Sequence, residues 1–253
     1  MAGGYGEPQE HPLTGLTRKT LYTLVLLSLA AMTHSLGSAD NRPPAISSTL
    51  TTIEVLERTQ VKAGELKTLG GRFRQIKHSR FLTEPMESTG VFQWKPPERF
   101  RWEVVQPVPF RVIANGSTIL LHYPDLNRAS LLRHPSGESL LGQVAGTAGD
   151  LASFKNLYHA RLLPVEPGQP EDTITLSLVP KSGRQDRFIK EIRVTIDPPT
   201  WLPKQVDIFE TSGDRTSIWL MDLVANGPME DALFLVSPPP GVQLQRLDGS
   251  ERR

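Results

Sequence analysis

The chain has 253 residues, of which 38% are hydrophobic and 22% charged, and both values are ordinary for a globular protein. Lysine and arginine number 28 against 27 for aspartate and glutamate, so the formal net charge of +1 gives no electrostatic reason to expect a nucleic-acid partner. The chain contains no cysteine, which excludes disulfides, thiolate metal sites and cysteine nucleophiles and predicts that no acylated cysteine serves as an anchor.

The N-terminal residues have the layout of an export signal. A basic pair at 18–19 precedes about a dozen mostly apolar residues at 21–32, and the small residues 37–39 follow. This combination is typical of a cleavable secretory signal, whereas a transmembrane anchor needs roughly 20 apolar residues. The sequence therefore predicts an exported protein rather than one held by a membrane helix.

This signal also sets the predicted domain boundary. We expect cleavage after Ala39, so that residues 1–39 form a leader and residues 40–253 form a single domain. About 200 residues with strands throughout are common for one barrel or sandwich. The polar stretch ahead of the basic pair is either part of a long leader or lies upstream of the true start.

The first element expected in this domain is an amphipathic helix over residues 49–62, capped by Ser47 or Ser48. Glu54 stands in its first turns, and its apolar residues fall roughly on helical spacing. These apolar residues are Leu50, Ile53, Val55, Leu56 and Val61. Such a face predicts that the helix packs on another part of the protein.

After this helix, alternation of apolar and polar side chains predicts strands. The alternation is strict at residues 99–104, where Phe100 and Trp102 lie on the face opposite the charged positions. Asn115 and Gly116 stand between two apolar runs, which is a strong hairpin signal. The sequence therefore favours neighbouring strands joined by tight turns.

The strand pattern is interrupted at residues 139–157, where three glycines loosen one or two short expected helices. The apolar residues chosen there as a lid are Leu140, Leu141, Val144 and Phe154. Strands then resume, and the last is expected at residues 232–235. About ten or eleven short strands predict a mainly β fold, an antiparallel barrel or sandwich, with the helical segments left to cover an open face.

No group of residues in the sequence has the pattern of a catalytic or metal centre. The six histidines show no close helical pair and no acidic cluster beside them, and no Gly-x-Ser-x-Gly frame, Walker loop or dinucleotide fingerprint occurs. We therefore expect no metal, no cofactor and no enzymatic activity. A lipid hydrolase stays as a less favoured alternative, because it would need a nucleophile with an oriented base.

Aromatic residues fall on consecutive expected strands, most of them with the same alternating phase. An ordinary core explains this pattern on its own, since strand faces commonly bury aromatic side chains. The functional interpretation is a single sheet that curves around an apolar cavity. The side chains chosen for the cavity wall are Phe92, Trp94, Phe100, Trp102, Phe110 and Leu120.

Residues 90–103, with the sequence GVFQWKPPERFRWE, resemble the signature of the LolA family of periplasmic lipoprotein carriers, in which a strand, Lys-Arg-Pro and Phe-x-Trp follow a glycine. The hairpin turn at 115–116 and the closing stretch 234–242 match the family's order and spacing as well. The resemblance extends from about residue 46 to residue 247, nearly the whole expected domain.

The resemblance implies an unclosed antiparallel β-barrel with short helices as a lid over an apolar cavity. It also implies a monomeric periplasmic carrier that accepts acylated lipoproteins, or other lipids, from an inner-membrane transporter and passes them to an outer-membrane receptor or to the membrane itself. The receptor LolB shares the fold but is a lipoprotein, so a chain without cysteine resembles the carrier. Periplasmic lipid-sensing regulators, which bind a membrane-bound anti-sigma partner, share the architecture and stay as an alternative.

One position departs from the family pattern. The family's arginine, which hydrogen-bonds to lid carbonyls in the closed state, aligns with Pro96, and proline offers no donor. Strand alternation places the adjacent Lys95 on the other face. The departure leaves open whether the cargo is a lipoprotein or another lipid.

Overall fold

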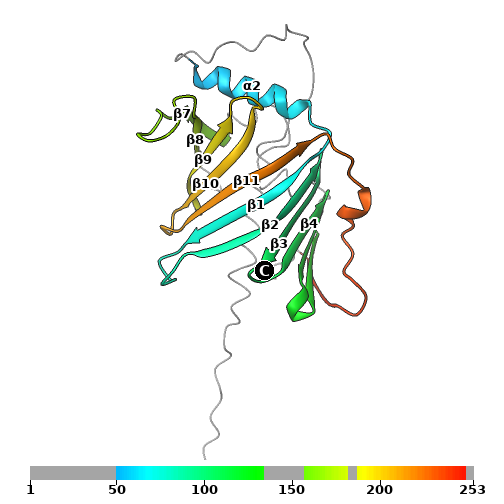
Figure 1. The fold of residues 1–253 in the computed structure, drawn as a ribbon. Helices are drawn as coiled ribbons and strands as arrows, with labels where there is room; N and C mark the ends of the chain where they lie inside the picture. Colours follow the sequence, from blue (N-terminus) through cyan, green and yellow to red (C-terminus); the bar gives the residue numbers. More distant parts are fainter. Residues whose placement is uncertain (1–49, 134–156, 182–186, 249–253) are drawn as a thin grey trace, which may run out of the picture.

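The computed structural model describes residues 50–133, 157–181 and 187–248 (Figure 1). They form one α-helix, two short 3-10 helices and twelve strands. The helices are α2 (Thr52–Gly64), η2 (Pro124–Leu126) and η3 (Asp231–Phe234). The strands are β1 (Leu69–His78), β2 (Met86–Lys95), β3 (Arg99–Gln106), β4 (Phe110–Asn115), β5 (Thr118–Tyr123), β6 (Arg128–Arg133), β7 (Tyr158–Leu162), β8 (Ile174–Pro180), β9 (Ile189–Asp197), β10 (Leu202–Glu210), β11 (Arg215–Ala225) and β12 (Gln243–Asp248).

Helix α2 begins three residues later than the sequence pattern predicted. Its N-cap is Thr51, whose hydroxyl accepts a hydrogen bond from the Glu54 amide at 3.2 Å, while the Glu54 carboxylate accepts one from the Thr51 amide at 2.8 Å. This reciprocal capping box satisfies two amides that would otherwise have no partner in the first turn. The predicted caps, Ser47 and Ser48, lie outside the described residues.

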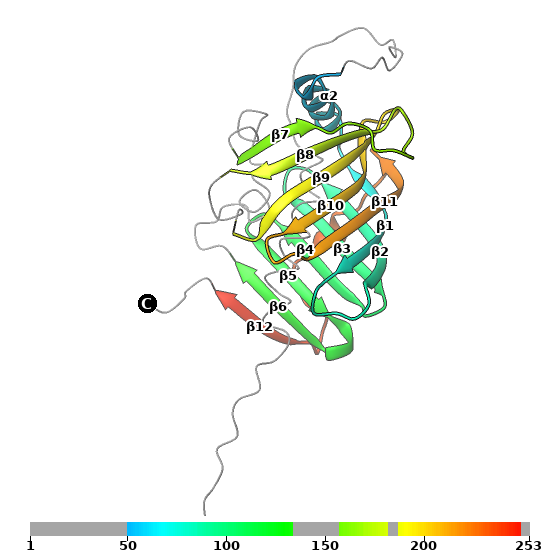
Figure 2. The same cartoon turned by 90° about the vertical axis from the view of Figure 1, so that its left-hand side faces the viewer.

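All twelve strands belong to one sheet, in the order β12-β6-β5-β4-β3-β2-β1-β11-β10-β9-β8-β7. Figures 1 and 2 show that the sheet curves strongly, and its edge strands β7 and β12 do not pair with each other. The predicted mainly β, unclosed barrel is therefore confirmed, with twelve strands in place of ten or eleven. Neighbouring strands are antiparallel except for β12, which runs parallel to β6.

The C-terminal part of the strand prediction was wrong. Residues 232–235 fall in and just after η3, where Phe234 is fully buried and Leu235 is 62% exposed. The last strand, β12, was missed, because it lies at the sheet edge with mostly exposed side chains and buries no apolar stripe. The periodicity of apolar residues indicates which side chains are buried. An edge strand with mostly exposed side chains therefore has no clear apolar pattern in the sequence.

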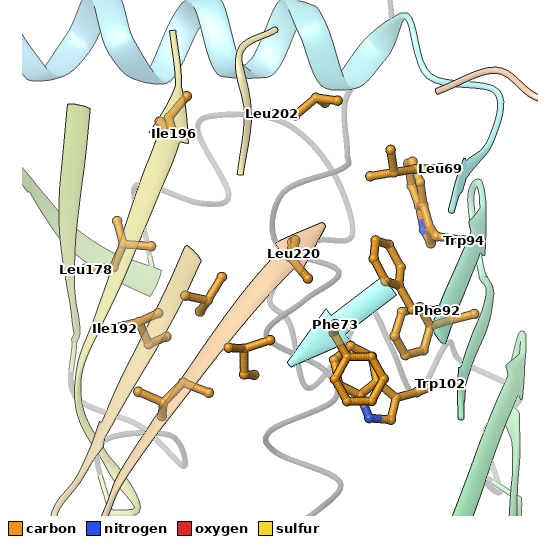
Figure 3. Packing of buried hydrophobic residues seen from close by; sticks show 14 of the residues in the cluster. Leu69, Phe73, Phe92, Trp94, Trp102, Leu178, Ile192, Ile196, Leu202 and Leu220 are labelled. Carbon is orange, nitrogen blue, oxygen red and sulfur yellow. The ribbon is translucent and has the colours of Figure 1, made fainter. Parts of the chain in front are cut away.

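The two faces of the sheet have separate apolar clusters. The larger cluster contains side chains from β1 to β5 and from β7 to β11, together with Val55 and Leu56 of α2. Figure 3 shows these side chains pointing toward a common interior from both arms of the curved sheet. We call this the inner face, and the opposite one the outer face.

The smaller cluster lies on the outer face. There Phe234 packs against Ile113, Leu120 and Ala129 of β4, β5 and β6. The C-terminal segment therefore crosses the outside of the sheet before it adds β12 to the edge. Among the described residues, no helix is both long and apolar enough to cross a membrane.

Candidate functional site

Five aromatic residues line one arm of the inner face, and we call them the aromatic wall: Phe73, Phe92, Trp94, Phe100 and Trp102. Each is at most 3% exposed. Strand register sets their order, because Phe92 lies opposite Trp102 and Trp94 lies opposite Phe100 across β2 and β3. The rings of Phe73 and Trp102 are stacked, with centroids 3.6 Å apart and an interplanar angle of 19°.

Gly90 makes room for this stack. It lies opposite Phe73 in the β1–β2 register. A Cβ atom at this position would lie 1.9 Å from the carbonyl oxygen of Glu103 and 2.7 Å from the Phe73 ring. Only glycine fits between a neighbouring backbone and an aromatic ring at such distances. Gly90 belongs to the family motif, but its sequence context predicted no packing role for it.

The remaining two predicted wall residues lie elsewhere. Phe110 is half-buried at the margin of the inner cluster, with its ring centroid 5.0 Å from that of Tyr123. Leu120 belongs to the outer-face cluster with Phe234, so its assignment to the cavity wall was wrong. The reason is that residues 118–122 of β5 are all buried, one set facing inward and the other beneath the C-terminal segment.

The opposite arm of the inner face is aliphatic, and no role was predicted for its residues from the sequence. It carries small and medium side chains at alternate positions of β8 to β11, a period-two signal that was present in the sequence. Figure 3 shows Leu178, Ile192 and Ile196 facing the aromatic wall across the interior. The residues of this aliphatic arm are Ile174, Leu176, Leu178, Ile192, Ile196, Val206, Ile208, Ile218 and Leu220.

Among the described residues, several buried polar atoms have no hydrogen-bond partner, and they occur on both faces of the sheet. On the inner face they are Nε1 of Trp94, the hydroxyl of Tyr123 and Oγ1 of Thr216, and on the outer face they include Nε of Arg111 and Nδ1 of His122. Burial of an unpaired polar atom costs free energy, and functional sites are one place where proteins keep such atoms. Tyr158 is the first residue of the edge strand β7. Burial raises the pKa of its hydroxyl group to about 12.

Helix α2 covers one end of the inner face. Val55 and Leu56 pack into the inner cluster, the Thr52 hydroxyl accepts a hydrogen bond from the Leu162 amide at 3.0 Å, and Arg58 stacks on Trp201 at 5.2 Å. The four residues predicted to form the lid fall within 134–156, outside the described residues: Leu140, Leu141, Val144 and Phe154.

The outer face is polar and its charges are largely paired. Glu103 accepts hydrogen bonds from Arg101 and Arg111, and Asp207 accepts them from Arg215, Ser217 and Gln205. Burial acts to raise the pKa of Glu103, but hydrogen bonds from its two arginines outweigh this effect and hold that pKa below its ordinary value.

A cavity of about 270 Å³ lies on this outer face beneath the β7–β8 connection. Its lining includes Arg193, Asp207 and Arg215 together with threonines and glutamines. Arg193 and Arg215 stack on the Phe209 ring, with guanidinium carbons 4.8 and 5.2 Å from its centroid. Because its lining consists mostly of polar and charged side chains, the cavity offers little for an apolar ligand. The described residues contain no group of three or more histidine, aspartate or glutamate side chains able to hold a metal ion.

The sequence matches one known protein family over more than half of its length. The profile of the family described as "Outer membrane lipoprotein carrier protein LolA" matches residues 64–237, well over half of the chain. The chain belongs to the LolA family. An outer-membrane lipoprotein carrier protein of Dechloromonas aromatica (strain RCB) is 25% identical over 179 residues, covering 70% of this chain and 81% of that relative.

Other members of the LolA family align over more of the chain. A carrier protein of Azotobacter vinelandii (strain DJ / ATCC BAA-1303) is 26% identical over 229 residues, covering 88% of this chain and 98% of that protein. The solved structure of a LolA superfamily protein from Nitrosomonas europaea is 14% identical, with a TM-score of 0.37, and covers 74% of this chain and 98% of the other.

Pro96, the residue that the sequence resemblance aligns with the family's arginine, comes directly after β2. Trp94 faces inward, whereas the Lys95 ammonium group donates a hydrogen bond to the Met229 carbonyl at 3.3 Å on the outer face and contacts Asp231 at 2.5 Å. The prediction that Lys95 points away from the inner face is therefore confirmed. At Pro96 the main chain has no amide hydrogen and the side chain no donor, so this position cannot supply the family's hydrogen bonds.

Proposed function

We propose that this protein is a periplasmic carrier that shields the acyl chains of lipoproteins, or of other lipids, between the inner and the outer membrane. Membership of the LolA family supports this role. The observation that carries the proposal is the inner face, where an aromatic wall and an aliphatic arm face each other in a sheet that does not close.

The chemistry of this face suits acyl chains. Each acyl CH₂ group that leaves water contributes about 0.8 kcal/mol, so a single chain of fatty-acid length supplies substantial binding free energy without any polar contact. The Trp94 indole N–H, which has no acceptor in the described part of the chain, offers a donor for an ester or amide carbonyl at the head of such a chain. Binding of this kind needs no catalytic group, and we propose a non-enzymatic role.

Release of the cargo is proposed to proceed without the family's arginine latch. In its place this chain has Pro96, which cannot hold a lid by hydrogen bonds. We expect the lid residues Leu140, Leu141, Val144 and Phe154 to be held by apolar contacts alone. A lid held in this way opens at low cost, which favours transfer to an acceptor that binds the acyl chains more tightly.

The first test is to find what the protein carries. We would purify it from the periplasm of its own host, record native mass spectra and extract lipids. Co-purified acyl lipid or lipopeptide is the expected result, and its mass identifies the cargo. The same spectra show whether the chain begins at residue 40, as cleavage after Ala39 predicts, and whether it is a monomer.

A matched pair of variants separates ligand binding from folding. Phe110→Ser changes a half-buried residue at the margin of the inner cluster, and we expect the affinity for a fluorescent fatty acid to fall about tenfold, on the order of 1.4 kcal/mol. Leu235→Ser, at a position 62% exposed and away from the inner face, should leave the affinity unchanged. A protein that is empty when purified and binds no fatty acid would overturn the carrier proposal and favour a partner-binding role.

A further inference from the structure

The connection between β1 and β2, residues 79–85, presents an apolar tip to solvent. Phe81 is 74% exposed and Leu82 is 47% exposed, and Met86 at the start of β2 is 40% exposed. Figure 1 shows this hairpin reaching away from the sheet at the end opposite α2. Three large apolar side chains exposed within six residues are unusual for a soluble surface, and such clusters mark interaction sites.

The base of this hairpin is anchored, so the tip is held out in solvent. The Ser79 hydroxyl donates a hydrogen bond to Asp214 at 3.0 Å, which ties the hairpin to the β10–β11 turn. The Lys77 ammonium group also pairs, at 3.2 Å, with the carboxylate of Glu210, the last residue of β10 before the same turn. Within the tip, the Leu82 amide donates to the Ser79 carbonyl at 3.0 Å and closes a turn. A tip fixed at its base cannot fold back to bury its apolar side chains.

We infer that this hairpin tip docks reversibly on the surface of a phospholipid bilayer. Phe81 and Leu82 are adjacent in a turn and both exposed, so apolar surface is concentrated at the end of the hairpin. A bilayer surrounds an inserted tip, whereas a protein partner contacts it mainly from one direction. A stable protein interface also buries about 800 Å² on each partner, far more than a few loop residues supply.

The seven residues of this connection include one cation, Arg80, and one anion, Glu84, so their formal net charge is zero. The Arg80 guanidinium carbon lies 4.9 Å from the centroid of the Phe81 ring, and Arg80 has no acidic partner among the residues that the structure describes. An aromatic ring with a cation beside it is typical of the membrane–water interface, where the ring lies among headgroups and the cation lies near phosphates. The neighbouring β3–β4 connection adds exposed Val108 at the same end of the sheet, since Gln106 pairs with Thr89 near the start of β2.

The absence of cysteine allows a direct test. The protein is purified from its host, and mass spectrometry first establishes that the apolar leader is absent. Phe81→Cys and, as a matched control, Val61→Cys on the exposed side of α2 are each labelled with an environment-sensitive fluorophore. We expect vesicles containing phosphatidylglycerol to shift the emission of the Phe81→Cys label to shorter wavelength and to leave the Val61→Cys label unchanged.

Flotation measures the contribution of the tip. In the same vesicles, Phe81→Ser with Leu82→Ser should lower the bound fraction at least tenfold, whereas Val61→Ser should bind like the unchanged protein. Arg80→Glu should weaken binding to phosphatidylglycerol vesicles and have little effect with phosphatidylcholine alone, because attraction to anionic lipid is electrostatic. Circular dichroism checks that each variant is folded.

Three results would overturn this inference. One is an unchanged protein that floats with neither kind of vesicle, and another is a double variant that floats as well as the unchanged protein. The third is an unchanged protein that binds no vesicles together with a double variant that loses cargo transfer, and this result would assign the tip to a protein partner. Fatty-acid affinity, measured on the same samples, tests the carrier proposal separately, since the tip lies outside the inner cluster.

Discussion

The two faces of this sheet are built by different means. The inner face is held by aromatic and aliphatic packing from ten of the twelve strands. The outer face is held by paired charges and by one C-terminal segment anchored at Phe234. Apolar packing is insensitive to pH, whereas paired charges depend on the ionisation of their side chains. The difference indicates which face is organised for a ligand.

The largest expected effect comes from tryptophan substitutions on the two faces. Trp102→Ala removes a 2% exposed ring stacked on Phe73 and should lower the free energy of unfolding by about 4 kcal/mol. Trp219→Ala, on the outer face beside Arg74, should cost only about 1 kcal/mol, because that ring is partly exposed. Urea denaturation measures both, and equal losses would contradict the contrast between the faces.

The second prediction concerns two glycines on neighbouring strands. Gly90→Ala forces a Cβ atom into the Glu103 carbonyl and the Phe73 ring, and we expect a loss of about 3 kcal/mol. Gly70→Ala is the control, since its Cβ atom would have no neighbour nearer than 3.5 Å and should change stability by about 0.5 kcal/mol or less. A small effect at Gly90 would show that the aromatic wall tolerates displacement.

The third prediction separates the C-terminal segment from the inner face. Phe234→Ala should cost about 2 kcal/mol, less than a phenylalanine in the main core, because the terminal segment can detach locally. Amide hydrogen exchange should accelerate in β12 and β6, while β9 and β10 keep their protection. Uniform acceleration across all strands would mean that both faces unfold as one unit.

The smallest expected effect is a pH dependence confined to the outer face. The pKa of Glu103 is lowered in the folded protein, so its contribution to stability is present above its ordinary value of 4.5 and is lost as pH falls through the lowered value. Glu103→Gln should cost about 1 kcal/mol at pH 7 and flatten the decline in stability between roughly pH 5 and pH 2. An unchanged acid profile would show that this carboxylate does not control it.

The sequence predicted the inner aromatic residues well where only one face of a strand is buried. Phe92, Trp94, Phe100 and Trp102 alternate with polar residues, and the structure places all four in one cluster. It failed at Leu120 because its strand is buried on both sides, which removes the alternation. A capping box at Thr51 and Glu54 was present in the sequence and would have given the correct helix start.

The aliphatic arm and the outer-face contacts were harder to foresee for a different reason. Whether Ile192 faces Trp94 depends on the curvature of the whole sheet, which no local pattern encodes. The pairing of Lys95 with Asp231 joins residues 136 positions apart. Long-range proximity of this kind follows from strand order, and strand order could not be read from periodicity alone.

A sheet that does not close has two edges, and each exposed edge is a template for pairing with another chain. Here one edge is β7, only five residues long and carrying His159 and Arg161. The other is β12, which alternates glutamine and leucine and ends in Arg246, Leu247 and Asp248. Short, charged edges disfavour the ordered stacking that leads to fibres. The unclosed sheet therefore has two edges that are poor templates for pairing with a second chain.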